Sequence, residues 1–271
     1  MGNTAAASGR PHHPSAGNLG ARPALVREDA APHRLPPASF PHGTEGARDV
    51  VRLGPDLDDA SLERLIGPVR DRRVLDLGCG AGAASVTLAR RGARVTAVEA
   101  STTRLAQARA AAELAEVRIE FHHSDLADLA FVRADSVDLV IAVYALAGVQ
   151  DLGRVFRQVH RVLTPGSPLL LSLPHPFATM LEADPDDSQP SPYLTRSAWS
   201  TSPVAWRSGG DEGVTHVHQI GDVFTTLSRS NFQVDALIEP QPLEHASGIH
   251  TSTLVDWVPP TLVVRARKLG I

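Results

Sequence analysis

The feature that most constrains the fold is a glycine-rich turn between a strand pattern and a helix pattern. Residues 74–77 form a short apolar run, Val-Leu-Asp-Leu, and the glycines of residues 78–82 follow it directly. Residues 83–90 then continue with helical periodicity. Glycine lets the backbone turn sharply and approach a ligand closely, so this order of patterns predicts the opening of a βαβ unit.

The alternation of strand and helix patterns continues along the chain. Further strands are predicted at residues 95–98, 117–121, 137–143, 169–173, 232–237 and 261–266. Helices are predicted between them, with Ser101 and Asp151 as N-caps and a later helix near residues 220–227. This succession predicts a doubly wound α/β domain, a mainly parallel sheet with helices on both faces.

A helix is also predicted before the first strand. Four apolar residues between Leu62 and Val69 recur at helical spacing, and either Asp58 or Asp59 can cap the start. We expect this helix to pack beside the sheet.

Two segments depart from the alternation. Residues 1–46 are rich in Pro, Gly, Ala and His without an apolar period, so they cannot bury enough surface to offset the entropy of ordering. We expect a disordered tail there; the alternative is a lid that orders when ligand binds. Residues 174–213 are rich in Pro, Ser and Asp and long for a loop, which predicts a substrate-cap insertion within a domain spanning residues 47–271.

Composition and charge exclude several classes of protein. The 271 residues carry a net charge of −4, so no global attraction for nucleic acid or anionic membrane is expected. No apolar run approaches about 18 residues, the length of a membrane span. The single cysteine, Cys79, excludes an internal disulfide and suits a reducing compartment. These features predict a soluble, cytoplasmic protein, and they leave its oligomeric state open.

Acidic residues recur where the predicted parallel strands end. Asp76 precedes the glycines, Glu99 ends the second strand and Asp125 follows the third. In open α/β sheets this edge binds ligands. A carboxylate can accept hydrogen bonds from an amino group at Asp76, from two ribose hydroxyls at Glu99 and from an adenine amine at Asp125. S-adenosylmethionine (SAM) carries all these groups and no phosphate, so this order of residues favours SAM.

A dinucleotide cofactor is the alternative. Gly78, Gly80 and Ala83 also satisfy the dinucleotide-binding pattern, with Glu99 as the acid for the ribose. An NAD(P)-dependent oxidoreductase therefore stays open. The position of Asp76 counts against it, because a carboxylate there would repel an anionic pyrophosphate.

Longer stretches resemble the class I SAM-dependent methyltransferases. Residues 74–82 resemble the SAM-binding signature of that family, and residues 138–141 with 162–166 resemble its fourth strand and the turn before its fifth. The resemblance runs from about Val50 to Lys268. It implies a Rossmann-like methyltransferase fold, whose seven-stranded sheet ends in an antiparallel edge hairpin, and an enzyme that methylates a small molecule on O, N or C. A SAM-binding protein that transfers no methyl, such as a regulator or a cyclase, is a further alternative.

The residues and the resemblance together define a predicted cofactor site. Its members are Asp76, Gly78, Cys79, Gly80, Gly82, Glu99, Ala100, Asp125, Leu126 and Ala142. Cys79 is expected there as a small packing residue, since no histidine partner is adjacent in sequence. The chain departs from the family at Ala147-Gly148, where many relatives carry histidine, and at Ser167, which replaces a turn glycine. The first departure leaves the substrate side open.

The substrate side offers fewer signals. His175 lies between two prolines directly after the fifth strand, and it is the candidate catalytic residue because imidazole can take a proton near neutral pH. The alternative is a histidine that only holds a turn. Tyr144, Trp199 and Trp206 are candidate substrate contacts, with core packing as the alternative.

No metal site is predicted. His216 and His218 are expected to alternate on one face of a strand, but no acidic or cysteine ligand stands at a recognisable spacing from them. His122 and His123 are expected to be polar residues at a strand end.

Overall fold

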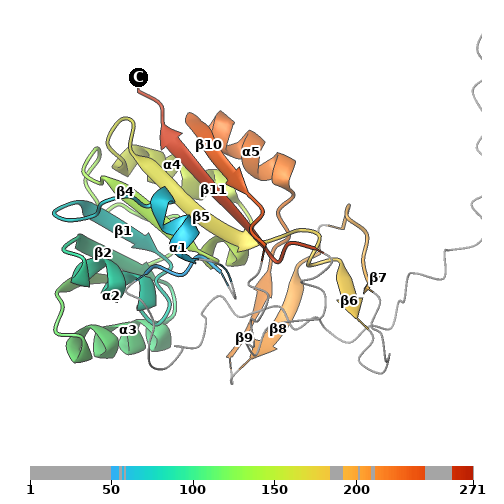
Figure 1. Ribbon diagram of the computed structural model, residues 1–271, viewed down its shortest axis with the longest axis horizontal. Coiled ribbons are helices and arrows are strands. Elements are labelled where there is room, and N and C mark those ends of the chain that lie inside the picture. The colour runs from blue at the N-terminus through green and yellow to red at the C-terminus, as the bar shows by residue number, and fades with distance from the viewer. Residues whose placement is uncertain are drawn as a thin grey trace, which may run out of the picture.

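A seven-stranded sheet forms the centre of the protein (Figure 1). The computed structural model describes residues 50–54, 57, 59–183, 192–200, 202–208, 211–241 and 258–270. The tail or lid predicted for residues 1–46 lies outside the described residues. Two small two-stranded sheets lie beyond the carboxyl end of β5 (Figure 1).

The large sheet confirms the predicted α/β fold. Its order is β10-β11-β5-β4-β1-β2-β3, and the five strands from β5 to β3 pair in parallel. Strand β11 lies between β5 and β10 and runs antiparallel to both, which makes the predicted antiparallel edge. The strands are β1 Arg73–Leu77, β2 Arg94–Glu99, β3 Ile119–His123, β4 Leu139–Val143, β5 Pro168–Pro174, β10 Phe232–Ile238 and β11 Thr261–Lys268.

Helices and short strands complete the described structure. The helices are α1 Asp59–Leu62, η1 Glu63–Leu65, α2 Ala83–Arg90, α3 Thr102–Leu114, η2 Ala145–Gly148, α4 Leu152–Val162 and α5 Ile220–Arg229, η marking a 3₁₀ turn. The short strands are β6 Leu181–Ala183, paired with β7 Pro192–Leu194, and β8 Val204–Ser208, paired with β9 Asp211–Thr215. Within the described part of the chain, no helix has the length and apolar character required to cross a membrane.

Two predicted N-caps start helices that flank the sheet. The Ser101 hydroxyl accepts a hydrogen bond from the backbone N–H of Arg104 at 3.4 Å, and the Asp151 carboxylate accepts one from Arg154 at 3.1 Å. Each bond satisfies a backbone donor that has no partner inside its helix. The starts of α3 and α4 are therefore set by local sequence.

The core has two layers, one on each face of the sheet. Leu88 of α2 and Ile66 after η1 pack on one face, and Phe156 of α4 and Leu227 of α5 pack on the other. Strand β5 is buried along its whole length, as expected for a central strand covered on both faces.

The helix predicted before β1 is shorter than expected. The helical turns end at Leu65, although Ile66 and Val69 are still buried against the sheet. Gly67 follows with a positive φ of 69°, and Pro68 removes a backbone N–H donor. These two residues stop the helix despite the apolar periodicity.

Two strand predictions are corrected as well. Strand β3 starts at Ile119, two residues after the predicted start. Strand β9 ends at Thr215, so His216 and His218 lie in the connection to α5 and do not share a strand face. The predicted cap of residues 174–213 is also not wholly irregular, because it contains β6, β7, β8 and most of β9.

Candidate functional site

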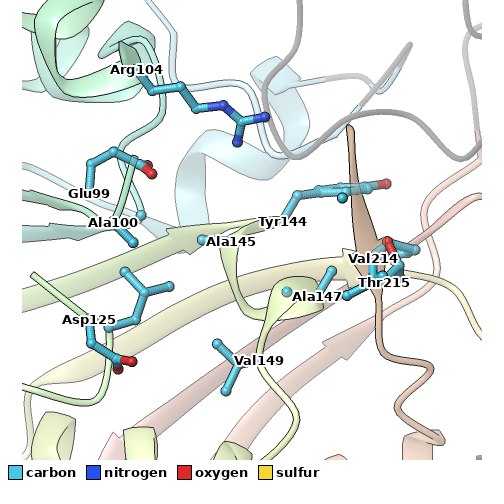
Figure 2. Close-up of a pocket in the computed structure, with 15 residues that line it drawn as sticks. Glu99, Ala100, Arg104, Asp125, Tyr144, Ala145, Ala147, Val149, Val214 and Thr215 are labelled. Atoms are coloured by element: carbon cyan, nitrogen blue, oxygen red, sulfur yellow. The ribbon is translucent and has the colours of Figure 1, made fainter. Parts of the chain in front are cut away.

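A cavity of about 260 Å³ opens at the carboxyl end of the parallel strands (Figure 2). It is lined by Gly78, Glu99, Ala100, Arg104, Asp125, Leu126, Tyr144, Ala145, Ala147, Gly148, Val149, Pro174, Gly213, Val214 and Thr215. One side comes from the turns after β1, β2 and β3. The other side comes from η2, the end of β5 and β9.

The glycine turn after β1 is shaped for close approach. Gly78 has a φ of 77°, and a Cβ added to it would lie 2.2 Å from the Cβ of Ala145 in η2. Gly82 has a φ of 90°, and a Cβ there would lie 3.0 Å from Ala108 of α3. Any larger residue would be strained at both positions. The turn therefore brings bare backbone to the cavity wall at Gly78.

Glu99 is fixed at the end of β2 by the backbone around it. Its carboxylate accepts hydrogen bonds from the N–H of Gly80 and from the N–H of Ser101, both at 2.9 Å. The residue is only 8% exposed and lines the cavity. These bonds hold the carboxylate in one orientation, and its remaining lone pairs can accept hydrogen bonds from a ligand.

Asp76 lies beneath the glycine turn and does not line the cavity. It is 1% exposed and accepts a hydrogen bond from the Ser85 hydroxyl at 2.5 Å. Burial raises the pKa of this carboxyl to about 6; the Ser85 bond opposes the shift, and the nearby charge of Glu99 adds to it. Asp76 therefore braces the turn against α2 through Ser85.

The adenine side of the predicted site also lies at the cavity. Asp125 and Leu126 both line it, and the Asp125 carboxylate accepts a hydrogen bond from the N–H of Ala127 at 2.7 Å. Arg104, which the sequence analysis did not single out, extends from the first turn of α3 on the same side as Glu99 (Figure 2). The signal available in the sequence was its place three residues after the Ser101 cap.

The turn after β4 forms the middle of the wall. Tyr144 has a φ of 56°, an uncommon value for a residue with a side chain, and it is 1% exposed yet borders the cavity. Its hydroxyl hydrogen-bonds the hydroxyl of Thr261 at the start of β11. Burial raises the pKa of the phenol above its ordinary value. Tyr144 therefore contributes a neutral ring to the wall.

Other wall residues were not predicted, because they are small or apolar and come from distant segments. Ala145, Ala147, Gly148 and Val149 belong to η2 or follow it, and Gly213, Val214 and Thr215 belong to β9. Their residue types carry no signal of a site, although Ala147-Gly148 departs from the family's pattern. Their shared place at the cavity depends on β9, the cap strand, folding back beside η2.

His175 is not on the cavity lining, in contrast to the predicted catalytic role. Its side chain is fully buried, its Nε2 contacts the Glu239 carboxylate at 2.9 Å, and its Nδ1 accepts the N–H of Phe177 at 3.2 Å. Burial lowers the pKa of the ring, and Glu239 opposes that shift. Both nitrogens are engaged by protein groups, so this geometry supports the alternative in which the histidine holds a turn.

Several other predicted residues also lie away from the cavity lining. Ala142 is buried in the core of the sheet, and Cys79 packs with Ala97 and Ala108, where burial raises the pKa of its thiol. Trp199 is 89% exposed, and the side chain of Trp206 lies outside the described residues. The predicted residues that the structure brings together at the cavity are Gly78, Glu99, Ala100, Asp125, Leu126 and Tyr144.

The histidines considered as metal ligands make other contacts. His218 hydrogen-bonds the carbonyl of Val149 at 2.8 Å through its Nε2. Over the described ranges, no three His, Cys, Asp or Glu side chains come together in a way that could hold a metal ion.

Comparison with known proteins agrees with the fold and the glycine turn. Residues 74–166 match the family described as a methyltransferase domain. A ubiquinone biosynthesis O-methyltransferase from Hahella chejuensis is 35% identical over 101 residues, which cover 37% of this chain and 42% of that protein. The chain thus matches less than half the length of such curated relatives.

Solved structures extend the likeness over most of the chain. An S-adenosylmethionine dependent methyltransferase from Mesorhizobium loti is 27% identical, with a TM-score of 0.64, and the likeness covers 77% of this chain and 96% of that one. The [4+2]-cyclase SpnF is 18% identical with a TM-score of 0.52, covering 78% of this chain and 82% of that one. The second likeness is one of fold alone.

The sheet order, the glycine turn at the cavity and these matches show a methyltransferase-like fold in which residues 74–166 match the methyltransferase-domain family. SAM is the cofactor that these matches imply. The same matches favour SAM over the NAD(P) alternative.

Proposed function

We propose that the protein transfers the methyl group of SAM to a small-molecule acceptor held between η2 and β9. The observation that carries this proposal is that one cavity is bordered both by the strand-end acids Glu99 and Asp125 and by the cap strand β9. A donor bound at the acids and an acceptor bound at β9 would therefore share one cavity. Holding two reactants in line and excluding water is the main requirement for methyl transfer.

The residues present fit SAM. When bound, SAM supplies an electrophilic methyl group on a sulfonium. We assign the ribose hydroxyls to the Glu99 carboxylate and the adenine amine to Asp125, with Leu126 against the ring. The methionine part is assigned to the cavity wall at Gly78, where the backbone carries no side chain. Asp76, Cys79, Gly80 and Gly82 act by holding the turn.

The acceptor half favours an apolar, flat molecule. Tyr144 and Pro174 present rigid rings, and Ala147, Val149 and Val214 present small apolar side chains. Such surfaces grip an aromatic or aliphatic ring and keep water from the sulfonium. The matched family region ends at residue 166, before the end of β5 and β9, so the likeness carries little information on the acceptor. We propose no acceptor atom.

The proposal extends to setting and partners. We propose that the protein acts in the cytoplasm, because its single cysteine suits a reducing compartment. We also propose that it has no nucleic-acid partner, since its net charge is −4. The segment of residues 174–213 is proposed as the substrate cap, because Pro174 and Gly213 at its two ends border the cavity, as do Val214 and Thr215 directly after it.

Binding is tested first. Calorimetry with SAM, S-adenosylhomocysteine and NAD should give binding of the first two and none of NAD. Binding of NAD alone would refute the proposed cofactor.

Transfer is tested with methyl-labelled SAM and four small rings that differ in acceptor atom: catechol, aniline, thiophenol and indole. Mass spectrometry should find S-adenosylhomocysteine and one labelled product. If SAM binds and neither this panel nor a metabolite extract yields a labelled product, the protein is a SAM-binding protein without transfer activity, and the proposed function fails.

A further inference from the structure

The connection from β9 to α5 is tied twice to the η2 turn. The backbone N–H of His216 donates to the carbonyl of Ala147 at 2.7 Å. Two residues later, the His218 ring bonds the carbonyl of Val149 at 2.8 Å through Nε2. Both carbonyls belong to residues that border the cavity. The cap strand and the turn after β4 are therefore joined directly.

The chemistry of the His218 bond is defined by its partner. A carbonyl oxygen only accepts, so Nε2 carries the hydrogen. Burial lowers the pKa of the ring; the carbonyls of Val149 and Leu146 and the charge of Asp222 oppose this shift, whereas His216 adds to it. The neutral ring with hydrogen on Nε2 and the protonated ring both donate this bond. The tie to Val149 is thus expected to persist across the neutral pH range.

The η2 turn is the wall shared by both halves of the cavity. On the cofactor side, Ala145 packs so closely on Gly78 that a Cβ there would clash with it. On the acceptor side, Val149 faces the same space as Val214 and Thr215 of β9. A shift of η2 would change the separation between the donor and acceptor surfaces, and methyl transfer is sensitive to such a displacement.

We propose that His218 is a positioning residue, which holds η2 against the cap strand and so fixes the acceptor at the distance from the methyl donor that transfer requires. The inference rests on the proposed function for its kinetic part. Its structural part, the anchoring of η2, is measurable without any turnover.

The test compares the full-length protein with His218→Ala, His218→Phe and His218→Gln. Phe keeps a ring without an N–H, whereas Gln places an amide N–H near the position of Nε2. Loss of one hydrogen bond should raise amide hydrogen exchange of residues 144–151 about 3- to 10-fold in Ala and Phe. The transfer rate, measured on the panel ring that the wild type methylates fastest, should fall about 10-fold or more. Affinity for S-adenosylhomocysteine should stay within about 3-fold, and Gln should restore both exchange and rate.

His216→Ala is the matched control, because the tie at that position uses the backbone N–H and should survive. It should leave both exchange and rate near the wild-type values. The proposal is overturned if residues 144–151 exchange equally in the wild type and in His218→Phe, or if the rate loss is as large in Gln as in Phe. A wild type that yields no labelled product from the ring panel or from the metabolite extract refutes the proposed function, and the exchange data then still decide whether His218 anchors η2.

Discussion

The two halves of the cavity differ in how much of the chain they need. The half that we assign to the cofactor comes from a single stretch between Gly78 and Leu126, in which the turn after each strand borders the cavity. The acceptor half joins η2 to β9, and its bonds span long separations: Val149 to His218 is 69 residues and Tyr144 to Thr261 is 117. One half is a repeated local motif, and the other is an assembly.

This difference explains why the cofactor is readable and the acceptor is not. A local motif restricts residue types at fixed spacing, as the glycine turn and the strand-end acids do. The acceptor half is built from distant segments, and it requires only small or apolar residues where those segments meet. Many different sequences satisfy that requirement. Substitutions in the cofactor half should thus change the affinity for SAM strongly, and substitutions in the acceptor half should change that affinity little.

The largest contrast is expected between two glycines. In Gly78→Ala the new Cβ meets Ala145 at 2.2 Å on a residue with φ of 77°, whereas nothing lies within 4 Å of a Cβ on Gly148. Strain and overpacking at Gly78 together cost about 4 kcal/mol if the turn keeps its shape. The turn relieves this cost by moving away from the ligand, so affinity for S-adenosylhomocysteine should fall by up to about 1,000-fold. Gly148→Ala should bind within about 2-fold of the wild type by calorimetry. Equal affinities for the two variants would remove the distinction between the halves.

The next effect is a pH-dependent loss of folding stability that arises from the buried Asp76. Its pKa is raised by burial from 3.8 to about 6, so the folded state binds the proton more tightly than the unfolded state. Stability contributed by Asp76 therefore falls as pH rises through that window, by up to about 3 kcal/mol. Urea unfolding should show the stability of Asp76→Asn, relative to wild type, rising between pH 4 and pH 7.

Asp138 provides a control of opposite sign. The hydrogen bond from Arg73 lowers the pKa of Asp138, so removing that carboxylate by Asp138→Asn should cost stability above pH 4. A pH-independent difference for Asp76→Asn would mean that burial does not hold the proton there.

Glu99→Ala is expected to weaken SAM binding by roughly 1 to 3 kcal/mol, because two ribose hydroxyls and the N–H groups of Gly80 and Ser101 lose their acceptor. Calorimetry measures the loss. Glu120→Ala is the control, since Glu120 is exposed on β3 and pairs with His122. Unchanged affinity in Glu99→Ala would place the ribose elsewhere.

His175→Ala should affect folding more than acid–base chemistry. The change leaves the Phe177 N–H and the Glu239 carboxylate without their partner, at a cost of about 1 to 3 kcal/mol in unfolding free energy. Turnover should fall by the same factor at every pH between 7 and 9, because burial keeps the pKa of the ring below that range. A loss confined to neutral pH would restore the catalytic role predicted from sequence.

The smallest effect is expected at Trp199, whose side chain is 89% exposed and does not line the cavity. Exposed side chains without specific contacts change stability by less than about 0.5 kcal/mol when replaced. Trp199→Ala should therefore leave the melting temperature, SAM affinity and transfer rate near wild type. A large rise in acceptor KM would show that the cap closes over the acceptor through this residue.

Particular elements show how far sequence patterns reach. The strands β1, β2, β4 and β5 lie within one to two residues of their predicted bounds, because buried parallel strands are short apolar runs bounded by turns. The predicted end of the helix before β1 was wrong, because the apolar periodicity continues past Gly67-Pro68 although the helical turns stop at Leu65. The predicted strand through His216 and His218 was wrong, because β9 ends at Thr215. Turn chemistry and tertiary contacts overrode periodicity at both places.

By itself the sequence determined the class of fold and the cofactor. The residues concerned act through local geometry: glycines with positive φ, acids at strand ends and helix caps within a few positions of their partners. Only the tertiary structure decided which residues border the cavity on the acceptor side, and it placed His175 in the interior and His218 against η2. Those outcomes depend on contacts between distant segments, which become favourable only when the whole sheet has formed and the cap has folded back on it.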